Sequence, residues 1–292
     1  MASSVVVVDD PRRLAGHVTW TRIKSTGWWI WVAVLAVILL FAVLGSWIAP
    51  FDHVAQNPRA KFTRPFSSSD AGFHLMGTDE LGRDVFSKVI IGARLTMFIA
   101  LMSTFIGGLI GTVLGMIAGY RGGRIDRLVM RLTEAQTAMP MFLIALLLLS
   151  SLGASVWNLI AILPTYIWPT FARLIRAETI RMRSSPFVEA AVALGCTTRT
   201  ILARHLLPNL ASRVGVLLAI SVGQVILAEA GLSFIGAGVQ SPDVTWGLLI
   251  SGGRKYLTVA WWPTVFPGLF VGLTVFALNG IGRRFTDVGR GT

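Results

Sequence analysis

Charged residues are almost absent from five long stretches of the chain. These stretches cover residues 28–48, 95–118, 135–172, 214–239 and 257–281, and Glu229 is the only charged residue in them. About 20 consecutive apolar residues are enough to cross the hydrocarbon core of a bilayer as a helix. The pattern therefore predicts a membrane protein built from spanning helices.

The stretch 135–172 is too long for a single crossing. As one helix it would extend about 57 Å at 1.5 Å per residue, nearly twice the roughly 30 Å of a hydrocarbon core. Residues 152–155, Leu-Gly-Ala-Ser, offer a turn at which the chain folds back. We therefore expect a helical hairpin here, and six spanning helices in all.

The basic residues predict the orientation of these six helices. Six crossings place both termini on one side, and that side would hold 18 of the 26 Lys and Arg residues. Cytoplasmic loops carry the excess of Lys and Arg. Both termini are therefore expected in the cytoplasm, with the protein in the cytoplasmic membrane.

Composition agrees with this assignment and narrows the function classes. Hydrophobic residues make up 54% of the 292 residues and charged residues 14%, and the formal net charge is +12. Ordinary soluble domains are about 25% charged. Because the basic residues flank the spans, we interpret them as topology signals and expect no nucleic-acid binding. The single cysteine, Cys196, has no partner for an internal disulfide.

Two connections are much longer than turns, and they set the expected segment boundaries. The predicted segments are a cytoplasmic amino-terminal segment (1–27), a first transmembrane helix (28–49), an extracytoplasmic segment (50–94), a core of five transmembrane helices (95–282) that includes a cytoplasmic loop (173–213), and a cytoplasmic tail (283–292). Loops of about 40 residues usually carry function. We expect an irregular chain over residues 50–71.

A short amphipathic helix is predicted inside the cytoplasmic loop. Ser185 is a suitable N-cap, with Pro186 at the first helical position and Glu189 in the first turn. Phe187, Ala191 and Leu194 would share one apolar face, and Gly195 would end the helix. Thr197 or Thr198 would then cap a second helix that ends before Pro208. The apolar face packs either against the chain's own helices or into a groove on a partner, and the residues alone do not decide between these.

The residues of this loop carry a specific resemblance. Glu189-Ala190-Ala191, Gly195 and Leu207-Pro208 resemble the EAA loop of ABC-importer permeases in spacing and in position before the penultimate span, although His205 replaces an aliphatic residue of the general pattern. Further segments resemble the C-type subunits of the peptide and nickel branch of that family. These are Gly77-Thr78-Asp79-Glu80-Leu81-Gly82-Arg83-Asp84, Gly92-Ala93-Arg94, Gly119-Tyr120-Arg121-Gly122-Gly123 and Leu232-Ser233-Phe234-Ile235-Gly236.

The resemblance implies an all-α fold of the type I ABC importer permeases and a role in importing dipeptides or short oligopeptides by alternating access. It implies that Pro186, Phe187, Glu189, Ala190, Ala191, Gly195, Leu207 and Pro208 couple this chain to a cytoplasmic ATPase subunit, which binds ATP and Mg. The other implied partners are a second homologous permease, an extracytoplasmic peptide-binding protein and membrane lipid. A nickel importer of the same family remains an alternative.

The chain itself lacks the parts needed to hydrolyse ATP. A phosphate-binding loop ends in Gly-Lys-Ser/Thr, and none of Lys24, Lys61, Lys88 or Lys255 follows a glycine. No catalytic residue and no bound cofactor are expected, and the four histidines show no metal-ligand spacing. A gradient-driven transporter and an intramembrane enzyme are the alternatives from other classes, but the expected repeats or convergent polar groups are not evident.

Three further features are candidate sites or contacts. Gly107, Gly111, Gly115 and Gly119 form a small-residue stripe that predicts close helix packing or, alternatively, a flexible helix along the pathway. Glu229 is either a hydrogen-bonded acid within the bundle or a pathway residue that meets a peptide's amino group. The cluster Asp79, Arg83, Asp84 and Arg94 is either an exposed local network or, by the resemblance, a surface for the binding protein or a cap on the pathway.

Overall fold

The computed structural model describes the backbone of residues 28–288 and the side chains of residues 28–282. The predicted segment 1–27 lies outside the described residues, as do residues 289–292 of the predicted tail. In chain order the elements are α1 (Trp28–Ile48), η2 (Pro58–Ala60), β1 (Ser67–Ser69), β2 (Gly72–His74), α2 (Val85–Arg121), α3 (Gly123–Ala138), α4 (Met141–Leu152), α5 (Val156–Ile162), α6 (Pro164–Arg183), α7 (Pro186–Ala193), α8 (Thr198–Thr200), η3 (Ile201–Leu206), α9 (Leu207–Phe234), α10 (Trp246–Gly253), η4 (Arg254–Tyr256) and α11 (Trp262–Val288).

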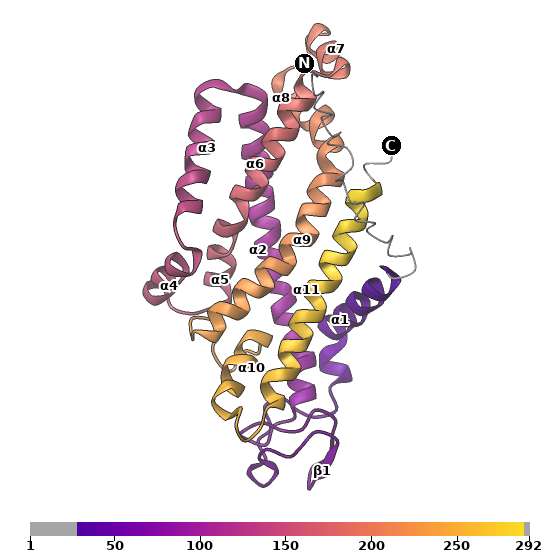
Figure 1. Ribbon diagram of the computed structural model, residues 1–292, viewed down its shortest axis with the longest axis vertical. Helices are drawn as coiled ribbons and strands as arrows, with labels where there is room; N and C mark the ends of the chain where they lie inside the picture. Colours follow the sequence, from indigo (N-terminus) through magenta and orange to yellow (C-terminus); the bar gives the residue numbers. More distant parts are fainter. Residues whose placement is uncertain (1–27, 289–292) are drawn as a thin grey trace, which may run out of the picture.

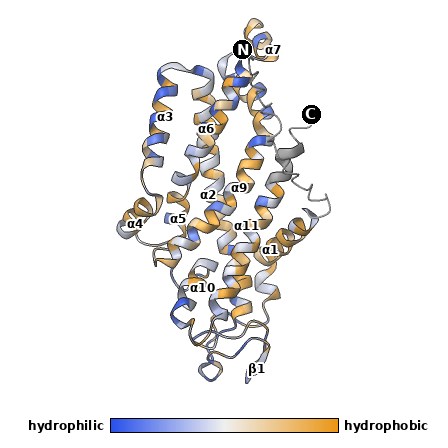
Figure 2. Cartoon of the chain, in the orientation of Figure 1, coloured by the Kyte–Doolittle hydropathy of each residue, from blue (hydrophilic) through white to orange (hydrophobic). Residues whose placement is uncertain are grey.

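The long helices α2, α6, α9 and α11 run roughly along the longest axis of the molecule (Figure 1). Helix α7 lies at one end of this bundle, which we call the α7 end. The β1–β2 hairpin and α10 lie at the other end, which we call the hairpin end. Hydrophobic positions dominate α1 and much of α9 and α11 (Figure 2). This distribution is that of helices whose outer surfaces face lipid.

Four helical stretches are long and apolar enough to cross a membrane: Trp28–Ile48, Val85–Arg121, Thr198–Phe234 and Trp262–Gly282. A fifth crossing is counted if α3 and α4, which meet at a bend of 84°, act as one span. The predicted turn at residues 152–155 is confirmed, because α4 ends at Leu152 and α5 begins at Val156, with Gly153 at φ 85° between them. The sixth predicted crossing is not among these stretches.

The helix that contains the second predicted span begins ten residues before that span. Helix α2 starts at Val85, so the last ten residues of the predicted segment 50–94 are helical. Asp84 caps this helix by accepting a hydrogen bond from the backbone N–H of Ser87 at 2.7 Å. The charges of Lys88 and Arg94 suggested a loop, but Lys88 is paired with Asp79 and Arg94 is exposed, so the helix accommodates both.

The predicted cytoplasmic loop 173–213 is also mostly helical. Helix α6 continues to Arg183, and the chain is helical again from Thr198 to Phe234. The prediction of a second helix that ends before Pro208 was therefore wrong. A π-helical segment, Ile201–Leu206, precedes Pro208, and the helix continues through the proline although it has no N–H to donate. Only residues 184–197 connect the two long helices. At the other terminus α11 runs to Val288, so the predicted tail is partly helical.

The glycine stripe of α2 packs against α6, as the first of its two interpretations predicted. A Cβ atom on Gly111 would lie 2.4 Å from the carbonyl oxygen of Trp168, and one on Gly115 would lie 2.6 Å from that of Ala172. Gly107 and Gly119 are similarly close to Ile167 and Arg176. The two helices can therefore approach this closely only because side chains are absent along this face.

The segment expected to be irregular contains a small sheet. β1 and β2 pair antiparallel, with Ser67 opposite His74 and Ser69 opposite Gly72. The all-α prediction is thus correct for the bundle but not for this hairpin, whose serine-rich first strand shows no alternation of apolar and polar residues.

Candidate functional sites at the two ends of the bundle

The short helix α7 begins and ends as the sequence predicts. Ser185 occupies the N-cap position and Pro186 the first helical position, although the Ser185 hydroxyl donates to the carbonyl of Met182 rather than capping the helix. At the other end, Gly195 has φ 78° and its N–H donates to Val192, while the N–H of Cys196 donates to Ala191. This arrangement is a Schellman motif, in which glycine adopts a left-handed conformation that other residues disfavour.

The faces of α7 differ from the prediction. Val188 and Ala191 are buried, at 1% and 4% exposure, and they pack in a cluster with Met116, Ile175, Ile201, Leu206 and Leu210. Phe187, Val192 and Leu194 are instead 41%, 55% and 84% exposed. Of the three residues predicted to share an apolar face, Ala191 is therefore buried, whereas Phe187 and Leu194 are exposed. Ala191 packs on the chain's own helices, while exposed apolar side chains of α7 remain uncovered beside it.

The remaining residues that the resemblance placed in the coupling region are at the surface. Pro186, Glu189 and Ala190 are exposed on α7, and Leu207 and Pro208 are exposed at the start of α9. The part of the chain that the structure describes offers Glu189 no side-chain hydrogen bond or ion pair. The candidate coupling residues thus form an exposed surface at the α7 end, apart from Ala191.

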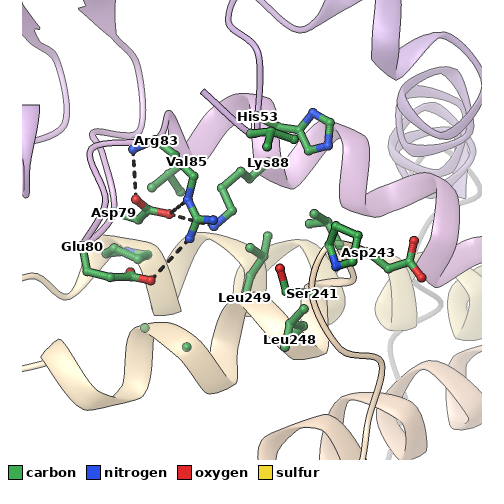
Figure 3. A pocket seen from close by; sticks show the side chains of 16 residues that line it. His53, Asp79, Glu80, Arg83, Val85, Lys88, Ser241, Asp243, Leu248 and Leu249 are labelled. Carbon is green, nitrogen blue, oxygen red and sulfur yellow. Dashed lines mark hydrogen bonds and ion pairs between the residues drawn. The ribbon is translucent and has the colours of Figure 1, made fainter. Parts of the chain in front are cut away.

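At the hairpin end, Asp79 lies at the centre of a buried network. One carboxylate oxygen accepts hydrogen bonds from the backbone N–H groups of Leu81 and Arg83, both at 2.9 Å. The other accepts from Arg83 Nε at 2.8 Å and from Lys88 Nζ at 2.7 Å (Figure 3). Glu80 also contacts Arg83, at 3.4 Å. The carboxylate is fully satisfied within a single loop and the first turn of α2.

The opposing charges determine the protonation of Asp79. Burial on its own raises the pKa of this carboxyl. The charge of Lys88 and its hydrogen bond, together with the contacts from Arg83, outweigh burial, so the pKa of Asp79 lies below its ordinary value of 3.8. Asp79 is therefore ionised at neutral pH.

Asp84 belongs to a second, neighbouring network. Besides capping α2, it lies 2.8 Å from His74 Nδ1, and His74 Nε2 lies 2.8 Å from Ser69 Oγ. His74 and Asp84 are 2% and 3% exposed. This chain of contacts ties the β-hairpin to the start of α2. The predicted cluster is thus a pair of buried networks and not an exposed one.

Sequence reasoning missed Lys88 and His74. The Asp84-x-x-Ser87 pattern is an N-cap signal that, once used, starts the helix at Val85 and brings Lys88 one turn into it. Arg94, which the sequence grouped with Asp79, Arg83 and Asp84, lies apart from both networks.

Two adjoining cavities open beside these networks. The first, of about 200 Å³, is lined by the paired residues Asp79, Glu80, Arg83 and Lys88, with His53 and Asp243 (Figure 3). The second, of about 400 Å³, shares His53, Pro242, Asp243 and Val244 with the first and adds Arg94 and apolar residues of α2. Arg94 therefore lines a cavity and takes no part in the salt-bridge cluster.

Glu229 is buried near the carboxyl end of α9, at 1% exposure. Its Oε1 atom accepts hydrogen bonds from Ser233 Oγ at 2.7 Å and from Thr245 Oγ1 at 2.9 Å. These bonds join α9 to the N-cap of α10. Of the two interpretations, the hydrogen-bonded acid within the bundle describes this geometry, and Glu229 lines neither of the two cavities at the hairpin end.

The apolar helices, the bundle and the two differently built ends define a multi-pass membrane protein. Residues 111–288 match the family described as "Binding-protein-dependent transport system inner membrane component". The chain belongs to this family of inner-membrane transport subunits, which are permeases and not enzymes.

Similar proteins agree with this assignment. The chain is 34% identical to the oligopeptide transport system permease protein OppC of Haemophilus influenzae, over 87% of this chain and 81% of that protein. It is 35% identical to the dipeptide permease protein DppC of Bacillus subtilis (87% and 78%). It is also 35% identical to the glutathione permease protein GsiD of Escherichia coli (97% and 92%). Among solved structures, the inward-facing MetNI methionine ABC transporter shares the fold, with a TM-score of 0.53 and 20% identity over 68% of this chain and 96% of that chain.

Proposed function

We propose that the chain is a permease subunit of an ATP-driven importer that carries dipeptides or short oligopeptides across the cytoplasmic membrane. The names of its relatives support a peptide substrate, because three at 34–35% identity transport oligopeptides, dipeptides and glutathione. Transport proceeds by alternating access in a cavity shared with a second, homologous permease. An extracytoplasmic binding protein delivers the peptide, and partner ATPases bind ATP and Mg.

The observation that carries this proposal is the division of the apolar residues of α7 into buried and exposed ones. Val188 and Ala191 fix the helix to the chain's own bundle, while Phe187, Val192 and Leu194 remain exposed. Exposed apolar residues grouped on a fixed helix are typical of a protein–protein contact. A helix held in this way transmits the displacement of an ATPase subunit to α6 and α9, whereas a mobile loop would absorb it.

The proposed topology has six crossings. The α5–α6 stretch, fourth in chain order, supplies the crossing that is missing from the five apolar stretches. Its charge-free part, residues 156–172, measures about 26 Å at 1.5 Å per residue. With α3–α4 as the third crossing, both termini and the α7 end lie on the same side. The Lys and Arg residues of α3, α6 and the 184–213 region favour the cytoplasm for that side.

The test is peptide-dependent ATP hydrolysis and uptake by the whole transporter in proteoliposomes. Gly195→Asp should reduce both strongly while membrane insertion and assembly of the bundle persist, because an L residue at φ 78° disrupts the end of α7. Gly268→Ala is the matched control, since a Cβ atom there meets nothing within 4 Å. Full transport by Gly195→Asp, or ATP-independent uptake by the native protein, would refute the proposal.

A second measurement in the same assay distinguishes a peptide substrate from nickel. Uptake of labelled dialanine and of nickel is measured with the binding protein that co-purifies with the complex. Peptide uptake without nickel uptake is the expected result, and the reverse would assign the chain to a nickel importer.

A further inference from the structure

The larger cavity at the hairpin end contains two opposite charges that do not pair with each other. Arg94 comes from α2, and Asp243 comes from the loop before α10. Within residues 28–282, neither side chain makes a hydrogen bond or an ion pair. A free cation and a free anion in one cavity are complementary to a molecule that carries both charges.

The rest of the wall is largely apolar. Ile91, Leu95 and Phe98 project from successive turns of α2, and Val244 faces them from the loop. The cavity holds about 400 Å³, within the range of about 300–1,000 Å³ found for small-molecule sites. An apolar lining with a few polar groups is the usual composition of such sites.

Arg94 and Asp243 are exposed, but the loop that carries Asp243 is joined to its neighbouring helices by buried hydrogen bonds. The backbone N–H of Trp246 donates to Thr96 Oγ1 at 3.0 Å, and its indole N–H donates to the carbonyl of Val89 at 2.8 Å. Thr245, two residues after Asp243, donates to Glu229. The loop is therefore fixed to α2 on one side and to α9 on the other, and Glu229 acts as a positioning residue for it.

The adjoining cavity provides a comparison. Its cations, Arg83 and Lys88, are already neutralised by Asp79, and Arg83 also contacts Glu80 (Figure 3). A ligand charge there would have to compete with these contacts. Of these two cavities, the one at Arg94 offers both charges without such competition from the described residues.

We propose that the Arg94–Asp243 cavity binds a zwitterionic short peptide at the extracytoplasmic mouth of the permease, an inference that rests on the proposed function. Arg94 receives the carboxylate, Asp243 receives the ammonium group, and an apolar side chain of the peptide lies against Phe98 and Leu95. The site would hold the peptide after the binding protein releases it.

The experiment measures peptide binding to the assembled transporter without its binding protein. The complex is placed in phosphatidylglycerol nanodiscs and titrated with fluorinated dileucine, its N-acetyl form and its C-terminal amide, with ¹⁹F NMR line broadening as the readout. Arg94→Gln should weaken binding of the free and N-acetyl peptides about tenfold and leave the amide unchanged. Asp243→Asn should weaken the free peptide and the amide to the same extent and leave the N-acetyl form unchanged.

The controls are Arg59→Gln and Asp70→Asn, two exposed residues of the same end that line neither cavity. Equal weakening of all three ligands by either variant would show a structural effect and overturn the proposal, as would an absence of broadening by the native complex. Loss of broadening in phosphatidylethanolamine discs would assign the cavity to a lipid headgroup, which carries the same two charges. None of these failures affects the proposed function, because ATP-dependent uptake measures that separately.

Discussion

Around Asp79 at the hairpin end, polar groups are buried and already paired, whereas on α7 at the other end apolar groups are exposed and uncovered. Asp79 and Lys88 are 3% and 8% exposed and bonded to each other, and the indole N–H of Trp262 donates to the carbonyl of Thr78. In contrast, Leu194 at the carboxyl end of α7 is 84% exposed. The Asp79 network completes its contacts within the chain, and α7 leaves an apolar surface that a partner can complete.

This difference predicts that the two ends affect different properties: the Asp79 network affects the stability of the fold, and α7 affects coupling to a partner. A buried ion pair destabilises the fold strongly when one member is removed, because the other charge stays buried. An exposed apolar side chain contributes little to folding but much to an interface. Substitutions at the hairpin end should therefore change the stability of the chain, and substitutions on the exposed face of α7 should change transport.

The largest effect is expected at Asp79. Asp79→Ala leaves the buried Lys88 ammonium without its partner and should destabilise the hairpin end by about 3–5 kcal/mol. The double variant Asp79→Ala with Lys88→Met should recover part of this loss, because it removes the unpaired charge. Thermal unfolding in detergent and hydrogen exchange of residues 57–84 measure the effect. Unchanged exchange in the single variant would contradict the pairing described here, and Asp70→Asn, an exposed acid nearby, is the control.

The glycine stripe lies on α2, the helix that runs from the hairpin end to the α7 end, so it provides the next test. Gly111→Ala should destabilise the bundle by about 2–3 kcal/mol, because the new Cβ atom collides with the Trp168 carbonyl and Phe171. Gly215→Ala is a matched control in α9, where a Cβ atom meets nothing within 4 Å. The unfolding temperature of both variants, with exchange followed at both ends, decides the outcome. An effect equal to that of the control would show that α2 and α6 need no glycine contact.

Much of the bundle could be predicted from hydrophobic pattern alone. The first helix agrees with the structure at Trp28–Ile48, and the turn near Gly153 follows from the length of the charge-free stretch. Helix ends were harder to predict, because charge was taken as a sign of loop. Lys88 and Arg173 both lie inside helices, and Lys88 is there because it pairs with an acid nine residues away in sequence.

The sites were predicted less completely than the fold. The ends of α7 follow from local rules, since Pro186 and Gly195 act within the helix itself. Its buried face depends on Met116, Ile175 and Leu210, which come from three other helices, and periodicity over eight residues does not identify that side. The separation of Arg94 from Asp79 likewise depends on where α2 begins, because Arg94 lies inside this helix and Asp79 stays in the loop before it.

Two adjacent residues of α7, one buried and one exposed, test whether stability and coupling depend on different side chains of this helix. Val188→Ala removes a buried side chain and should reduce stability by about 1–2 kcal/mol with little direct change in coupling. Phe187→Ala should leave stability unchanged and lower peptide-stimulated ATP hydrolysis severalfold. Phe73→Ala is the control, because Phe73 is 52% exposed at the opposite end. Identical behaviour of Phe187→Ala and Phe73→Ala would mean that the exposed face of α7 contacts no partner.

The smallest effect is expected from acid, and it should be confined to the hairpin end. The folded pKa of Asp79 lies below its ordinary value of 3.8, so its ionised form stabilises the fold above that value, and this stabilisation is lost as the pH falls through the folded pKa. The amides of Leu81 and Arg83, which donate to Asp79, should keep constant protection between about pH 5 and 8 and lose it below about pH 4. The amides of Gly195 and Cys196 donate only to backbone carbonyls, so their protection factors serve as the reference at the α7 end. If Asp79→Asn shows the same loss of protection in acid as the native chain, another group is responsible, and the contrast between the two ends does not depend on this carboxylate.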